Sequence, residues 1–162
     1  MEKSDKKDPV SEVLSAASSI IVFADNTENK LREKLLKRGF EKEYVDVAIE
    51  RLKSAGVVND ERLIFTAVEA IANKKLYGRG RIKLELQKMG FERSLISDCF
   101  EECTEDIDFK ENCLKLAVKK RLDKKLIDRE KSKNAAAALA RYGYGYSEIK
   151  YAMMRLLENE EN

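Results

Sequence analysis

The sequence predicts an all-α protein built from three tandem repeats of three helices. Its 162 residues contain one proline and seven glycines, and these are the residues that most often interrupt helices. A short phrase also occurs three times, with a leucine four residues before a glycine and an aromatic residue directly after it. The glycines are Gly39, Gly90 and Gly143, so the phrase recurs after 51 and then 53 residues. Self-similarity at a period of this size is the signature of a repeat array.

A longer helix is expected ahead of each glycine phrase. Apolar residues at helical spacing predict these three helices over 10–23, 60–76 and 108–127. Asn59 or Asp60 would cap the second of them, and Asp106 or Asp108 would cap the third.

Each phrase itself is expected to separate two short helices. A glycine after a basic or polar last turn can adopt the left-handed conformation that ends a helix, because it has no Cβ atom. Ser94 and Ser147 are expected to cap the helix that follows in the second and third repeats. Asp25 and Glu28 form a capping-box pattern at the start of the helix before the first glycine. Three helices in each of three repeats make nine.

These elements divide the chain into three repeats with short ends. The connections at 54–56 and 102–106 are short, so neighbouring repeats are expected to touch. The predicted segments are a disordered N-terminus (1–9), three-helix repeats at 10–57, 58–106 and 107–158, and an acidic tail (159–162).

The composition argues against catalysis, a bound metal and a membrane segment. The chain has no histidine, which removes Ser-His-Asp and Cys-His pairs and imidazole ligands. Cys99, Cys103 and Cys113 are odd in number and lie in helical patterns, so ordinary buried thiols in a reducing cytoplasm are the better interpretation. No apolar run approaches the ~18 residues of a membrane helix. We therefore expect no catalytic residue, cofactor, metal or membrane contact.

Two further motifs have a structural interpretation beside a chemical one. The glycine-rich, basic segment 77–81 lacks the Gly-Lys-Ser/Thr ending of a phosphate-binding loop and follows a helix, so a tight interhelical turn is favoured over a nucleotide site. The segment 59–61 (Asn-Asp-Glu) is favoured as a helix cap over a carboxylate site.

Charge is balanced overall but not locally. The 32 basic and 30 acidic residues leave a net charge of +2, so no global field indicates a partner. Basic residues nevertheless dominate 74–88 and 115–133, and acidic residues dominate 92–111. Basic helical faces can neutralise phosphates, but most charge runs are solvated faces, and the pattern alone leaves both interpretations open.

Three consecutive motifs together resemble the RecX regulatory proteins. They are Leu31-Arg-x-x-Leu35-x-x-x-Gly39-Phe40, then Gly56-Val-Val-Asn59-Asp60-Glu61-Arg62, then Tyr77-Gly78-Arg79-Gly80-Arg81-Ile82-x-x-Glu85-Leu86-x-x-Met89-Gly90-Phe91. The resemblance covers 27–157. The chain departs from the family at Asn26-Thr27, where many members carry Arg-Ser, and in its alanine-rich third repeat.

The resemblance implies three-helix repeats in an elongated, curved array and a modulator of the RecA recombinase. Such proteins lie in the groove of the RecA–DNA filament and lower its ATPase, recombinase and coprotease activities in DNA repair and the SOS response. A cytoplasmic monomer that also contacts single- or double-stranded DNA would fit this role. The residues expected to contact the filament are Lys74, Arg79, Arg81, Lys88, Lys119, Lys120, Lys124 and Lys125.

Two other classes of function stay open at this point. The same basic bands suit a stand-alone helical repeat that binds DNA or RNA. A repeat array also suits a scaffold that binds a protein partner unrelated to recombination.

Overall fold

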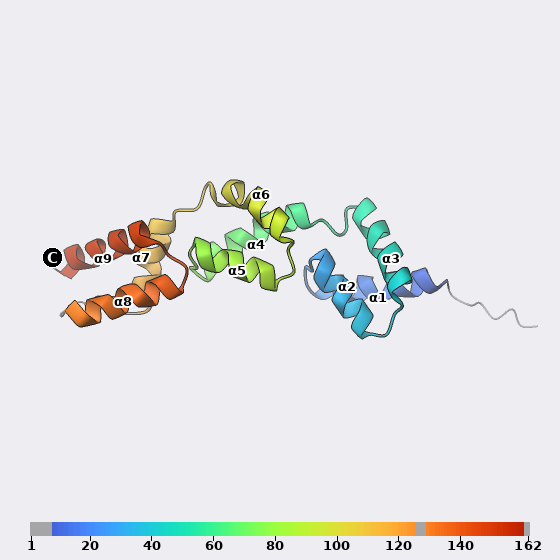
Figure 1. The fold of residues 1–162 in the computed structure, drawn as a ribbon, viewed down its shortest axis with the longest axis horizontal. Helices are drawn as coiled ribbons and strands as arrows, with labels where there is room; N and C mark the ends of the chain where they lie inside the picture. The colour runs from blue at the N-terminus through green and yellow to red at the C-terminus, as the bar shows by residue number, and fades with distance from the viewer. Residues whose placement is uncertain (1–7, 126–128, 161–162) are drawn as a thin grey trace, which may run out of the picture.

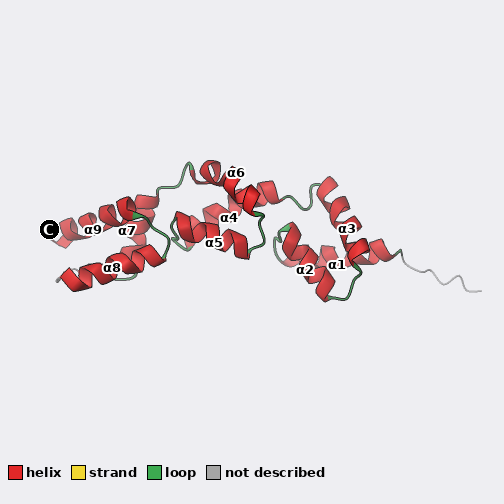
Figure 2. Ribbon diagram, in the orientation of Figure 1, coloured by secondary structure: helices red, strands yellow, loops and turns green. Residues whose placement is uncertain are grey.

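The computed structural model describes residues 8–125 and 129–160. Within these residues the chain forms α-helices, one short 3-10 helix and no strand, as Figure 2 shows. The elements are α1 (Pro9–Phe23), α2 (Glu28–Lys37), α3 (Lys42–Ser54), α4 (Asp60–Lys74), α5 (Arg79–Lys88), α6 (Arg93–Thr104), α7 (Phe109–Lys119), η1 (Leu122–Lys125), α8 (Arg129–Arg141) and α9 (Tyr146–Glu160). The predicted all-α fold is confirmed.

The helices follow one another along the long axis of the molecule in three groups (Figure 1). The groups are α1–α3, α4–α6 and α7–α9, which we call the first, second and third unit. They form an elongated, curved array in which each unit contacts its neighbour in sequence. Within the described residues, no helix is long and apolar enough to cross a bilayer.

The repeated glycines end the second helix of each unit, as predicted. Gly39, Gly90 and Gly143 have φ angles of 89°, 93° and 95°, in the region that L-residues with a Cβ atom avoid. The N–H of each glycine donates to the carbonyl three residues earlier at 3.0 Å. The turn then directs the next aromatic side chain inward, and Phe91 and Tyr144 are buried.

Asparagine and aspartate cap two of the longer helices, also as predicted. The Oδ1 atom of Asn59 accepts the N–H of Arg62 at 3.1 Å at the start of α4. Asp108 does the same for Glu111 at 3.1 Å at the start of α7. These side chains satisfy backbone donors that have no partner within the helix.

The other predicted caps are wrong. Thr27, not Asp25, caps α2, and its hydroxyl accepts the N–H of Lys30. The helices α6 and α9 begin at the second residue after the buried aromatic side chain of each turn. Ser94 and Ser147 therefore lie inside the first turn, and the extended Glu92 precedes α6 instead.

Two of the longer helices end earlier than predicted, because a residue with positive φ turns the chain. The helix expected to reach 127 ends at Lys119 with α7, and Arg121 (φ 55°) directs Leu122 into the core at the start of η1. The helix expected to reach 76 ends at Lys74 with α4, and Leu76 (φ 58°) is buried at the turn. In both cases the chain leaves the helix early, and the leucine that follows is buried in the core.

The helical region also extends further at both ends than the predicted segments. Asp8 caps α1, which begins at Pro9, and α9 continues to Glu160. Position 9 is therefore not part of a disordered segment, and positions 159 and 160 are helical. The rest of those two predicted segments, 1–7 and 161–162, lies outside the described residues.

The apolar side chains form two separate cores. One is formed by the first unit together with Val58, which follows α3, and includes Leu31 and Ile49. The other is shared by the second and third units and includes Leu86 and Leu139. The second and third units are thus one packed body, whereas the first unit has its own interior.

Candidate functional site

The glycine turn of the third unit is built into the start of α5. The N–H of Gly78 donates to the carbonyl of Tyr142 at 2.8 Å, and the N–H of Gly80 donates to the carbonyl of Gly143 at 3.2 Å. A Cβ atom on Gly143 would lie 2.3 Å from the backbone nitrogen of Arg81. The glycines of 77–81 therefore allow two backbones to meet, and their N–H groups are used by the protein itself. This supports the interpretation of the segment as a turn rather than a nucleotide site.

Side chains also stabilise this contact between the second and third units, which we call the second joint; the contact between the first and second units is the first joint. The buried Tyr144 hydroxyl donates to the carbonyl of Leu76 at 2.6 Å, and burial raises the pKa of Tyr144. The guanidinium of Arg79 lies 2.8 Å from the Glu148 carboxylate and 4.2 Å above the ring centre of Phe109. The second and third units are therefore held in one fixed orientation.

The joint brings two tyrosines and three cations together on the surface. The ring centres of Tyr77 and Tyr142 are 5.9 Å apart with an interplanar angle of 48°. The Arg81 guanidinium lies 5.2 Å from the centre of the Tyr77 ring, and the Lys75 ammonium lies 5.9 Å from it. The Lys120 ammonium lies 5.2 Å from the centre of the Tyr142 ring. We call these five residues the tyrosine–cation cluster.

The cluster joins the two basic bands of the sequence. Lys75 and Arg81 belong to the first band and Lys120 to the second. The neighbouring Tyr142 side chain raises the pKa of Lys120. Aromatic rings beside cations can stack on bases and neutralise phosphates, and the same groups can bind an acidic protein surface.

The eight residues predicted to contact a partner lie in several different environments in the structure. Arg81 and Lys120 belong to the cluster, and Lys74 and Lys119 are exposed next to it in sequence. Arg79 is engaged in the joint by Glu148 and Phe109. The remaining three are Lys88, which pairs with Glu85 in the last turn of α5, and Lys124 and Lys125, which lie in η1 and whose side chains are outside the described atoms.

Sequence reasoning missed Tyr77, Tyr142 and Lys75 as members of a site. The sequence indicated part of this arrangement, because each tyrosine directly precedes a glycine of a turn. Their proximity depends on how two repeats dock, which no local pattern reports.

At the joint between the first and second units, a glycine turn of one unit again contacts the start of a helix in the other. The Thr27 hydroxyl donates to the carbonyl of Met89 at 2.7 Å, and Asn29 Nδ2 donates to the carbonyl of Gly90 at 2.8 Å. The N–H of Glu28 donates to Asp60 Oδ1 at 3.0 Å, and burial raises the pKa of Asp60. The glycine turn of the second unit is thus seated on the start of α2.

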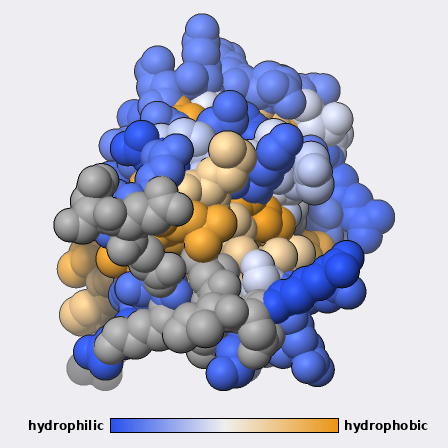
Figure 3. Space-filling model, turned by 90° about the vertical axis from the view of Figure 1, so that its left-hand side faces the viewer, coloured by the Kyte–Doolittle hydropathy of each residue, from blue (hydrophilic) through white to orange (hydrophobic). Residues whose placement is uncertain are grey.

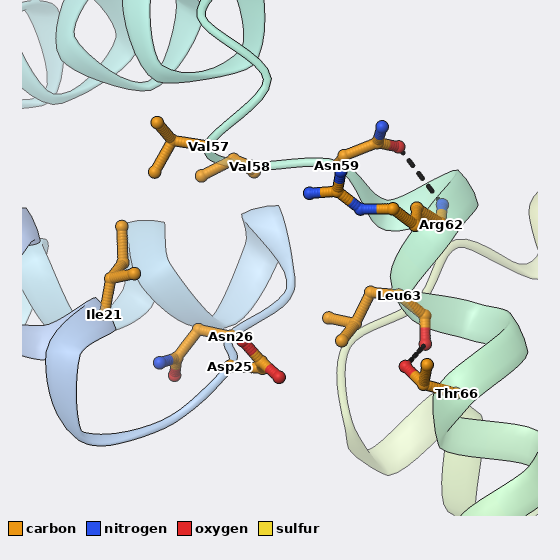
Figure 4. A pocket seen from close by; sticks show the side chains of 9 residues that line it. All are labelled: Ile21, Asp25, Asn26, Val57, Val58, Asn59, Arg62, Leu63 and Thr66. Carbon is orange, nitrogen blue, oxygen red and sulfur yellow. Dashed lines mark hydrogen bonds between the residues drawn. The ribbon is translucent and has the colours of Figure 1, made fainter.

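A cleft of about 210 Å³ remains beside this joint. Figure 4 shows Ile21, Asp25 and Asn26 of the first unit on one side and Leu63 and Thr66 of α4 on the other. The first joint therefore rests on polar contacts between two separate cores, whereas the second and third units share one apolar core.

The cysteines are free thiols inside or close to the core. Burial raises the pKa of Cys103 to about 11 and that of Cys113 to about 12. Cys99 is half-buried, and burial raises its pKa as well. In the described part of the chain, no group of three or more potential ligand side chains is arranged to hold a metal ion.

The fold and this surface define a helical-repeat protein with a basic and aromatic surface where its second and third units meet. No protein-family model matches the chain, but individual proteins do. Regulatory protein RecX of Clostridioides difficile (strain 630) is 35% identical over 150 residues, which cover 90% of this chain and 68% of that protein. Regulatory protein RecX of Clostridium perfringens (strain 13 / Type A) is 30% identical over 158 residues, covering 96% of this chain and 73% of that protein.

A solved structure has the same fold. The crystal structure of RecX from Lactobacillus salivarius matches with a TM-score of 0.79 at 23% identity, over 92% of this chain and 97% of that one. The chain belongs to the RecX family of regulatory proteins, as its motifs predicted.

Proposed function

We propose that the protein regulates the RecA recombinase by binding its filament on DNA and lowering the filament's ATPase, recombinase and coprotease activities. The observation that supports this most directly is the tyrosine–cation cluster, which joins both basic bands on the array of a RecX family member. We further propose that the protein acts in the cytoplasm as a monomer, without a cofactor or a catalytic residue of its own.

The architecture suits an extended partner. A row of repeats presents a long surface that can follow a filament over several subunits. The fixed joint between the second and third units holds the cluster in place before binding, which reduces the ordering cost of association. The cations at the cluster can contact DNA phosphates or acidic groups of the recombinase.

The test is a titration of the protein against the ATPase activity of RecA on single-stranded DNA. We expect inhibition at amounts well below those needed to coat the DNA. The double variant Lys75→Glu/Lys120→Glu should raise the concentration for half-inhibition about tenfold or more, because it reverses two charges at the contact. The control Lys37→Glu/Lys42→Glu makes an equal charge change on the first unit and should inhibit like the wild type. No effect of the wild-type protein on RecA would overturn the proposal.

A stand-alone nucleic-acid-binding function is the second candidate. The cations beside two tyrosine rings favour it, since aromatic stacking with basic contacts is how many proteins bind single strands. Inhibition of RecA only at amounts that coat the DNA would support this second function against the first. Absence of both inhibition and DNA binding would instead indicate a scaffold for an unrelated protein.

A further inference from the structure

An open apolar groove lies between α8 and α9 in the third unit. Its volume is about 700 Å³, and its apolar lining includes Ala136, Ala137, Ala140, Tyr146, Ile149 and Met153. Figure 3 faces this end of the molecule and shows an apolar patch with hydrophilic residues above it. The Tyr146 side chain is 81% exposed, which is high for an aromatic residue.

The repeats themselves show what is missing from this groove. In the first unit, Arg32 of α2 reaches across to α3, where its Nε lies 3.2 Å from Asp46 Oδ1. In the second unit, Lys83 of α5 lies 4.7 Å above the Phe100 ring of α6. The position that corresponds to Arg32 and Lys83 in the third unit is Ala136. A long cation therefore bridges the last two helices of the unit in two units, and a methyl group stands at this position in the third.

The charges at the edge of the groove indicate the kind of partner. The charged residues that line it are Arg129, Lys133 and Lys150, and none of the described lining residues is acidic. An apolar floor whose described rim charges are all basic complements an apolar stripe flanked by carboxylates. A groove between two helices is also the shape into which a third helix packs.

We propose that this groove binds an acidic amphipathic helix of a partner protein, with the apolar stripe of that helix on the alanine floor and its carboxylates against the basic rim. The 13 residues of α8 extend for about 20 Å, which is enough for about three turns of a bound helix. This inference does not depend on RecA being the partner, because it rests on the groove alone.

The probe is a fluorescent, end-capped peptide with leucines at i, i+3, i+4 and i+7 and glutamates on both sides of the leucine stripe. We expect saturable binding in an anisotropy titration that weakens as salt is added. A peptide with the same composition and scrambled leucines, and one with lysine in place of glutamate, should each bind at least about tenfold more weakly. If either control peptide binds as well as the probe, the proposal is wrong.

The decisive variant is Ala136→Lys, which restores the cation of the other units. It adds a positive charge, so electrostatics alone would strengthen the binding of an acidic peptide. Closure of the groove should nevertheless weaken binding about tenfold or more. The matched control Asn134→Lys places the same charge at an exposed position of α8 outside the groove and should bind at least as tightly as the wild type. Equal affinities of both variants would overturn the proposal.

Further measurements test whether the variants are folded and whether a second copy of the chain or a nucleic acid binds in the groove instead. Lys150→Glu should also weaken peptide binding while the circular dichroism spectrum and melting temperature stay those of the wild type. Concentration-dependent dimerisation that Ala136→Lys abolishes would show that a second copy fills the groove. Competitive displacement of the peptide by a single-stranded oligonucleotide would assign the groove to nucleic acid. Either result would refute a helical protein partner.

Discussion

Tyr77 and Tyr142 come from different repeats, yet their ring centres lie 5.9 Å apart with Arg81 and Lys120 beside them. The pair exists because the glycine turn of the third unit is hydrogen-bonded to the start of α5, from Gly78 to Tyr142. A backbone contact that holds the fold together thus also creates the most chemically distinctive surface of the molecule.

Removal of one ring should weaken the contact with single-stranded DNA, alone or within a RecA filament. Tyr142→Ala should lower affinity by about 1–3 kcal/mol if a base stacks on the ring, whereas Tyr142→Phe keeps the ring and should bind nearly as well. Anisotropy with a labelled oligonucleotide measures both variants. Equal losses for alanine and phenylalanine would show that the hydroxyl beside Lys120, not the aromatic face, makes the contact.

The three repeated glycines should differ in how they tolerate a methyl group. All have similar positive φ angles, but a Cβ atom on Gly39 meets nothing within 4 Å, whereas one on Gly143 meets the Arg81 backbone nitrogen at 2.3 Å. Gly39→Ala should therefore cost about 1–2 kcal/mol for the left-handed conformation alone. Gly143→Ala should cost more than about 3 kcal/mol because it also separates two units. Urea unfolding of the two variants gives the comparison, and similar losses would contradict the docking contact.

The Tyr144 hydrogen bond should make stability fall in alkaline solution. Burial raises the pKa of Tyr144 above that of the unfolded chain, which is about 10. The folded state then retains this proton more strongly, so the contribution is complete below about pH 10 and is lost as the pH rises through the folded-state value. Tyr144→Phe cannot ionise and should show a smaller decline in the free energy of unfolding between pH 9 and pH 11, measured by urea titration at each pH.

The same variant should be less stable than the wild type at neutral pH. It leaves the buried carbonyl of Leu76 without its 2.6 Å partner, at a cost of about 1–3 kcal/mol. Parallel alkaline declines in the two proteins would assign that decline to groups other than Tyr144.

Loss of the Thr27 hydroxyl should loosen the first unit selectively. Thr27 is buried, caps α2 and donates to the Met89 carbonyl of the second unit. Thr27→Val keeps the shape but removes both interactions, with an expected cost of about 1–2 kcal/mol. Amide hydrogen exchange should accelerate in α1–α3 and stay unchanged in α7–α9, because the two cores are separate. Uniform acceleration along the chain would show that the units unfold together.

Local patterns predicted the parts of the fold that depend on local chemistry. The glycine caps and the Asn59 and Asp108 caps follow from what one residue can do for its own helix, and they are confirmed. The end of α7 was missed because it depends on the burial of Leu122 in a core formed by distant residues. Ser94 and Ser147 were wrongly predicted as caps because the buried aromatic side chains determine where the next helices begin.

The candidate site was predictable in its charge but not in its arrangement. The two basic bands are visible in the sequence, and Arg81 and Lys120 were named from them. Only the docking of the third unit on the second shows that Arg79 is held by Glu148 and that Tyr77 meets Tyr142.

The separation of the two cores has a mechanical consequence. The interior of the first unit ends with Val58, and that of the rest of the chain begins with Ile64. Between them lie a cleft and the polar contacts of Thr27, Glu28 and Asn29, so we expect bending of the molecule to be concentrated at this point. We therefore expect the second and third repeats to move as one rigid body and the first repeat to tilt against them.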